Sequence, residues 1–117
     1  MHALVAFDYR PRVSHNRDIR NLVFVGFMGV GKSTVGHQLA NELGFEFVDT
    51  DEVIEKQTGM KISDIFSNAG EPAFRDLERK VVVEMADWKD KVVATGGGLV
   101  AQPGNLERLK ENALVVC

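Results

Sequence analysis

The sequence has little of several things that would define a protein class. Cys117 is the only cysteine, so an internal disulfide is impossible, and the three histidines, His2, His15 and His37, lack metal-ligand spacing. No apolar run is long enough to cross a bilayer, and the first residues do not resemble a secretory leader. These absences predict a protein of the reducing cytoplasm without a membrane partner.

Positive charge is not in excess either. Lys and Arg number 14 against 17 Asp and Glu, which gives a net charge of −3. The chain therefore has no overall positive field to hold nucleic acid, and any anion binding must be local. The hydrophobic fraction of 44% over 117 residues is ordinary for one small globular domain. Residues 1–20 show no sustained period, so we expect a flexible extension followed by a domain at 21–117.

From residue 21 onward, apolar segments typical of buried strands alternate with helical patterns. Strands are expected at 21–27, 45–50, 91–95 and 113–117. Helices are expected from the glycine-rich stretch to a stop at Gly44, over 51–59, over 63–70 with Ser63 as cap, from Pro72 to Trp88, and from Pro103 to about Asn112. This alternation predicts an α/β fold with a parallel sheet flanked by helices, whose ligands gather at the carboxyl ends of the strands.

The stretch GFMGVGKST, residues 26–34, fits the pattern G-x-x-x-x-G-K-[ST] between a predicted strand and a predicted helix. Glycines there let consecutive N–H groups turn inward around an anion, and bound phosphate offsets both the helix dipole and the charge of Lys32. Ser33 would reach Mg²⁺ with its hydroxyl. The alternative is a glycine-rich turn with a solvated lysine. The motif and its context favour a nucleotide phosphate site.

Two carboxylates, Asp49 and Asp51, lie at the end of the second predicted strand. Asp49 is a candidate helix cap, with Glu52 three residues later as its reciprocal partner. One cap does not require two carboxylates, and this strand end belongs to the expected ligand edge. We therefore expect a metal or substrate role for at least one of them, in addition to capping.

Arg75 and the glycines at 96–98 are ambiguous when taken alone. Arg75 can pair with Glu71 four residues before it and Glu78 three residues after it, which would suffice as a surface explanation. Gly96, Gly97 and Gly98 would suit either a hinge or a close approach of ligand to the backbone.

Taken together and in order, GFMGVGKST, DTDEVIE, GEPAFRDLE and ATGGGLV resemble shikimate kinase, a P-loop small-metabolite kinase of the nucleoside monophosphate kinase-like group, over nearly all of 21–117. The resemblance implies a P-loop NTPase-type three-layer sandwich and ATP-dependent phosphorylation of the 3-hydroxyl of shikimate, on the route to chorismate and the aromatic amino acids.

The resemblance also implies roles for individual residues. The ATP phosphates would be held by Gly29, Val30, Gly31, Lys32, Ser33 and Thr34, with Lys32 neutralising the transferring group and Ser33 and Asp49 serving Mg²⁺. Asp51 would hydrogen-bond the substrate hydroxyls and is the candidate base. Arg75 would pair with the substrate carboxylate, and Gly96, Gly97 and Gly98 would line the ring.

The resemblance ends where the sequence ends, after the fourth strand. Shikimate kinases continue into a lid with an arginine, a second substrate arginine, and a final strand and helix. We therefore expect a C-terminally truncated domain with an incomplete sheet, low activity on its own, and a monomeric state when complete. The alternatives are another small-metabolite kinase such as gluconate kinase, a non-catalytic nucleotide-binding module, or an unstable fragment.

Overall fold

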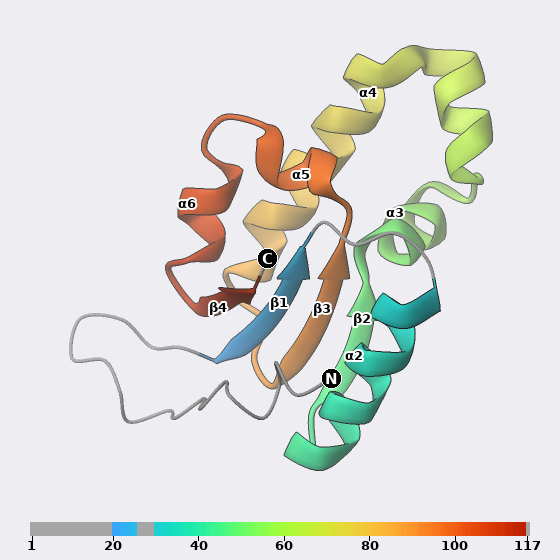
Figure 1. The fold of residues 1–117 in the computed structure, drawn as a ribbon. Coiled ribbons are helices and arrows are strands. Elements are labelled where there is room, and N and C mark those ends of the chain that lie inside the picture. The colour runs from blue at the N-terminus through green and yellow to red at the C-terminus, as the bar shows by residue number, and fades with distance from the viewer. Residues whose placement is uncertain (1–19, 26–29, 117) are drawn as a thin grey trace.

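The structure is a computed structural model that describes residues 20–25 and 30–116, with the side chains of α2 described from Thr34 onward. Four strands alternate with helices along the chain (Figure 1). The elements are β1 (Asn21–Val25), α2 (Val30–Leu43), β2 (Glu46–Asp49), α3 (Thr50–Thr58), α4 (Ile62–Met85), β3 (Lys91–Thr95), α5 (Gly97–Ala101), α6 (Asn105–Leu109) and β4 (Ala113–Val116).

The strands form one parallel sheet in the order β2-β3-β1-β4. β1 and β3 occupy the centre, and their residues pair in register from Asn21 opposite Lys91 to Val25 opposite Thr95. All five residues of β1 are buried, as expected for a central strand that is covered on both faces. The parallel α/β sheet predicted from the alternation of apolar segments is confirmed.

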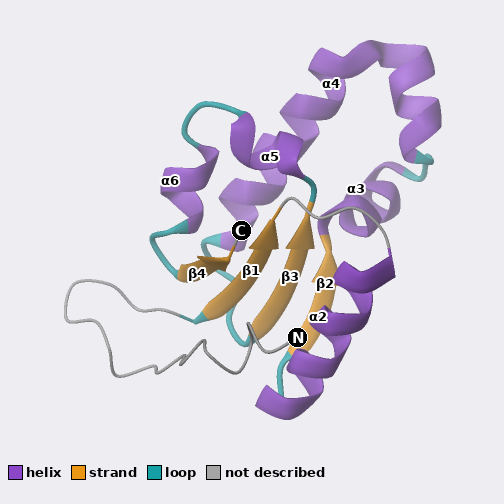
Figure 2. Cartoon of the chain, in the orientation of Figure 1, coloured by secondary structure: helices purple, strands orange, loops and turns teal. Residues whose placement is uncertain are grey.

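Helices cover both faces of the sheet and make two separate cores (Figure 2). Leu22 and Phe24 of β1 pack with Leu39 of α2 on one face. Val23 and Val25 of the same strand pack on the other face with apolar residues of α3, α4, α5 and α6. Alternate residues of one apolar strand therefore contribute to different cores, which gives the three-layer arrangement.

The predicted helix stops at Gly44 and Gly59 are confirmed, since α2 and α3 end immediately before them. The predicted Ser63 cap is wrong. Helix α4 begins at Ile62, and its N-cap is Lys61 without a side-chain hydrogen bond. A backbone bond from Asp64 N–H to the Lys61 carbonyl starts the helix instead (2.9 Å). Backbone geometry thus replaces the side-chain cap that the sequence suggested.

Helix α4 is interrupted at Gly70, whose φ of 85° and ψ of 168° lie outside the helical region. A non-glycine residue rarely adopts such a φ, so this position separates the two segments that the sequence predicts before and after it. Pro72 then lies in the first turn of the second segment, where its missing N–H costs no hydrogen bond. That segment ends at Met85, three residues before the predicted end at Trp88.

The predicted helix from Pro103 to about Asn112 is wrong in its bounds. Within this range the structure has only the short helix α6, from Asn105 to Leu109, and a separate short helix, α5, precedes the range and takes in Gly97 and Gly98. Pro103 lies between them, and Gly104 with a φ of 86° precedes α6. In the described part of the chain, no helix is both long enough and apolar enough to cross a membrane.

Candidate functional site

The predicted phosphate loop falls mostly outside the described structure. Gly29 belongs to the stretch 26–29, which is not described, and only the backbone of residues 30–33 is described, within the first turn of α2. Thr34 is the first described side chain, and it is exposed. The strand before the motif and the helix after it are present as predicted, because β1 ends at Val25 and α2 begins at Val30. The predicted strand before the motif and the predicted helix after it are therefore confirmed.

The acidic pair lies where β2 passes directly into α3. Asp49 is the N-cap of α3, and its Oδ1 accepts the backbone N–H of Asp51 at 2.8 Å, so the predicted cap is confirmed. Thr50 between them is buried, and its hydroxyl donates to the Ala94 carbonyl of β3 at 3.4 Å. This link fixes the start of α3 against the carboxyl end of β3. Asp51 thus projects from a fixed backbone at the ligand edge of the sheet.

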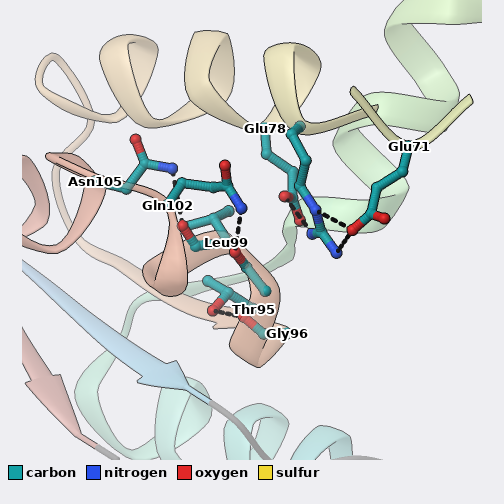
Figure 3. Close-up of polar contacts among 9 residues, drawn as sticks. Glu71, Glu78, Thr95, Gly96, Leu99, Gln102 and Asn105 are labelled. Atoms are coloured by element: carbon teal, nitrogen blue, oxygen red, sulfur yellow. Dashed lines mark hydrogen bonds and ion pairs between the residues drawn. The ribbon is translucent and has the colours of Figure 1, made fainter. Parts of the chain in front are cut away.

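Arg75 lies in the second segment of α4 with a carboxylate on each side of its guanidinium (Figure 3). Its Nη1 donates to Glu78 Oε1 at 2.7 Å, while Nε and Nη2 both donate to Glu71 Oε2 at 3.2 Å and 3.1 Å. The guanidinium carbon also lies 5.4 Å from the centre of the Phe74 ring. The pairing with Glu71 and Glu78 that the sequence predicts is confirmed.

The two carboxylates differ sharply in burial. The Glu78 side chain is 4% exposed and that of Glu71 is 62% exposed. Burial raises the pKa of Glu78, although the Arg75 hydrogen bond opposes this shift and the negative charge of Asp51 adds to it. Hydrogen bonding to Glu78 and Glu71 raises the pKa of Arg75 against the effect of burial. The influence of Asp51 on Glu78 places α3 and α4 carboxylates within electrostatic range of each other.

Gly98 brings the first turn of α5 against the same guanidinium. A Cβ built on Gly98 would lie 2.4 Å from Arg75 Nη1 and 2.8 Å from both Cζ and Nη2. Side chains further along the chain hydrogen-bond to carbonyls of α5 (Figure 3). The buried Asn105 donates to the Leu99 carbonyl at 2.8 Å, and Gln102 makes a long 3.5 Å contact to the Gly98 carbonyl. The backbone at Gly98 therefore contacts Arg75 directly.

An open hollow of about 400 Å³ adjoins Arg75. Its lining residues are Glu71, Pro72, Arg75, Asp76, Arg79 and Gln102. The volume is suited to a small organic molecule. The guanidinium already donates to Glu71 and Glu78, and Asp51 and the glycines at 96–98 are not among the lining residues.

Among the predicted site residues, the structure brings Arg75 and Gly98 into contact and places Asp51 within electrostatic range of Glu78, the buried partner of Arg75. Gly96 caps α5 and Gly97 is its first residue, without a described contact to Arg75. In the described ranges, no group of three or more His, Cys, Asp or Glu could hold a metal by itself.

Sequence reasoning missed the importance of Glu78, Gln102 and Asn105. Glu78 was expected only as a surface partner, although it follows the core residue Phe74 by four positions and therefore shares its helix face. That spacing was the available signal. Gln102 and Asn105 carried no comparable signal, because the turn between α5 and α6 that positions them was not predicted.

Known proteins match this chain over most of its length. A family model described as "Shikimate kinase" matches residues 28–117. A shikimate kinase from Thermodesulfovibrio yellowstonii is 50% identical over 99 residues, which cover 85% of this chain and 57% of that protein. One from Persephonella marina is 53% identical over 98 residues, covering 84% and 60% respectively. The chain thus spans less than two thirds of the length of these relatives.

Solved structures agree in fold. The shikimate kinase from Acinetobacter baumannii in complex with shikimate gives a TM-score of 0.77 at 46% identity, covering 83% of this chain and 54% of that one. The enzyme from Aquifex aeolicus vf5 gives 0.75 at 38% identity, covering 81% and 56%. With the family match over residues 28–117 and the geometry described above, this chain belongs to the shikimate kinase family.

Proposed function

We propose that this protein transfers the γ-phosphoryl group of ATP to the 3-hydroxyl of shikimate, in the biosynthesis of chorismate and the aromatic amino acids. The observation that carries the proposal is the Arg75 guanidinium, held between Glu71 and Glu78 and against the backbone at Gly98. A family member that gives a TM-score of 0.77 with this chain has been solved in complex with shikimate.

The substrate has one carboxylate and three hydroxyls, and the site supplies groups for both. Arg75 would bind the carboxylate through paired N–H donors, since bidentate arginine contacts are the strongest of this kind. Asp51 would accept hydrogen bonds from the hydroxyls and take the proton of the attacking one. The loop carrying Gly96, Gly97 and Gly98 would cover the ring. Phosphoryl transfer requires mainly positioning of the reactants and stabilisation of charge. These residues would position the substrate.

The ATP phosphates would lie at the N-terminus of α2, held by Gly29, Val30, Gly31, Lys32, Ser33 and Thr34. Backbone N–H groups at a helix N-terminus bind anions, and Lys32 adds a positive charge beside the transferring group. The motif sequence and the strand and helix on either side of it support this assignment.

We propose Mg²⁺ as the metal, held by Asp49 and Ser33 together with the phosphates. Asp49 fits this role because capping occupies its Oδ1 with a single N–H bond, and carboxylate oxygen is the donor that Mg²⁺ prefers. In the described residues, no group of three or more His, Cys, Asp or Glu side chains is placed to hold a metal ion. That composition suits a metal which protein holds through one or two carboxylates and which nucleotide phosphates and water complete.

We further propose a cytoplasmic enzyme that acts as a monomer on small molecules and does not bind nucleic acid. The net charge of −3 supports the last point, because nucleic-acid binding normally requires a clustered positive surface. Residues 21–117 would belong to the P-loop kinase domain, with 1–20 as an extension.

The test is the initial rate of ADP formation by this chain with Mg²⁺, ATP and shikimate. D-gluconate is the matched control substrate, since it is also a polyhydroxy carboxylate and is the substrate of another small-metabolite kinase. The proposal predicts a rate with shikimate, none with gluconate, and a loss in the Arg75→Ala variant. Equal rates with the two substrates, or a shikimate-dependent rate that Arg75→Ala leaves unchanged, would contradict it.

A further inference from the structure

The two edges of the Arg75 guanidinium are occupied in different ways. Nη1 donates to Glu78 through one short bond of 2.7 Å. On the opposite side, Nε and Nη2 converge on a single oxygen of Glu71 at 3.2 Å and 3.1 Å. The Nε/Nη2 edge is one of the paired-donor edges that binds a carboxylate in bidentate fashion, and here it is already engaged by a carboxylate.

Burial decides which carboxylate can leave. Glu78 is 4% exposed, so releasing Arg75 would leave a buried carboxylate without its cationic partner, which is costly. Glu71 is 62% exposed and regains water when it leaves. An exposed ion pair of this type contributes little to stability, so its exchange is inexpensive.

The hollow beside Arg75 lies on the exchangeable side. Glu71 and Pro72 line it, whereas Glu78 does not. A ligand in this hollow lies beside both Arg75 and Glu71, so to reach the Nε/Nη2 edge it has to compete with the Glu71 carboxylate. Two carboxylates cannot share the same pair of donors in full, and their negative charges repel each other.

We propose that Glu71 occupies the carboxylate subsite of Arg75 when substrate is absent, and that the substrate carboxylate binds by displacing it. Glu78 stays in place throughout and orients the guanidinium. Glu71 is then a specificity-determining residue, because only a ligand with its own carboxylate can replace the ion pair between Arg75 and Glu71. The inference rests on the proposed function for the identity of that ligand, shikimate.

Calorimetric titration of shikimate into the wild-type chain and the Glu71→Gln variant tests the displacement. Glutamine keeps the size of the side chain but competes more weakly for the guanidinium, so shikimate should bind about two- to fivefold more tightly, as expected when an exposed ion pair no longer has to be broken. Asp76→Asn is the matched control. Asp76 lines the same hollow and is 61% exposed, but its ion pair is with Arg79. The Asp76→Asn substitution removes one negative charge, as Glu71→Gln does, but leaves the Nε/Nη2 edge of Arg75 unchanged. Its effect on shikimate affinity should therefore be smaller.

Glu78→Gln should act in the opposite direction and weaken shikimate binding by about tenfold or more, since a buried charged hydrogen bond that orients Arg75 is lost. If Glu71→Gln binds shikimate no more tightly than Asp76→Asn does, the displacement is refuted. The proposed function would still stand in that case, provided that the wild-type chain binds shikimate. In that case the substrate uses the other edge of the guanidinium.

A second readout does not depend on shikimate. The ¹⁵Nε–H signal of Arg75 in the ligand-free protein should shift in Glu71→Gln and stay in place in Asp76→Asn. Added cyclohexanecarboxylate, a simple ring carboxylate, should perturb that signal more in Glu71→Gln than in the wild type at equal concentration. The inference about Glu71 would be overturned by an unchanged Arg75 signal in Glu71→Gln, or by equal perturbations of that signal in the variant and the wild type. Both results are independent of shikimate binding and hence of the proposed function.

Discussion

Replacing Gly98 by alanine places a methyl group against the Arg75 guanidinium. The added Cβ would lie 2.4 Å from Nη1, and ordinary contact begins at 3.4 Å, so the guanidinium must retreat by 3.4 − 2.4 = 1.0 Å. A movement of this size directed away from Glu78 would lengthen the 2.7 Å bond beyond hydrogen-bonding range. The loss of a hydrogen bond between charged groups costs about 1.5–3 kcal/mol, which sets the upper limit of the effect.

The assay is urea unfolding of four proteins: the wild type, Gly98→Ala, Arg75→Ala and the double variant. Gly98→Ala should lower the free energy of unfolding by up to about 3 kcal/mol in the wild type. In the Arg75→Ala background the closest clashes are removed, because the three atoms nearest to the added Cβ all belong to Arg75. The change in helix propensity is the same in both backgrounds and cancels in the cycle.

This double-mutant cycle thus isolates the contact between Gly98 in α5 and Arg75 in α4. An equal cost of Gly98→Ala in both backgrounds would refute the reasoning, since the destabilisation would then not arise from Arg75. Shikimate binding offers a parallel check: Gly98→Ala should weaken it in proportion to the coupling energy, by about tenfold for each 1.4 kcal/mol.

Three further predictions concern other parts of the molecule. Gly36→Ala should destabilise the fold by about 1–3 kcal/mol in urea unfolding, because the added Cβ would lie 2.3 Å from the Phe47 ring; full stability would contradict this packing. For Glu78, burial raises the folded-state pKa above the unfolded value, so its ionised form disfavours folding. The stability of the wild type relative to Glu78→Gln should therefore decline as the pH rises above the unfolded-state value of about 4, and an increase there would be inconsistent with the assigned shift. Lys32→Ala should abolish measurable ATP binding in a nucleotide titration without altering the thermal midpoint, and unchanged ATP affinity would exclude the phosphate-loop assignment.

Much of the fold could be predicted because the central strands carry apolar runs. Val92, Val93 and Ala94 of β3 are consecutive and fully buried, as in a strand covered on both faces, and such a run is visible without tertiary information. The stops at Gly44 and Gly59 were equally visible. The start of α4 was not, because Ser63 offered a cap that the backbone did not use.

The site was harder to predict because its geometry depends on contacts between distant segments. The motif around Arg75 identified the residue and both of its carboxylate partners, which lie within one helical turn. Spacing alone could not distinguish the buried Glu78 from the exposed Glu71, since that difference arises from packing against the rest of the fold. Nor could it place Gly98, 23 positions after Arg75, against the guanidinium. The difference in burial between Glu71 and Glu78 therefore arises from tertiary structure.

The most direct test of the Arg75 site is a calorimetric titration of shikimate into this chain in the presence of Mg²⁺ and a non-hydrolysable ATP analogue, beside the same titration of Arg75→Ala. We predict saturable binding at one site per chain in the wild type and none in the variant, with both proteins equally folded by circular dichroism. Binding of equal affinity in the two proteins, or none in the wild type, would contradict the claim that Arg75 forms the substrate carboxylate site.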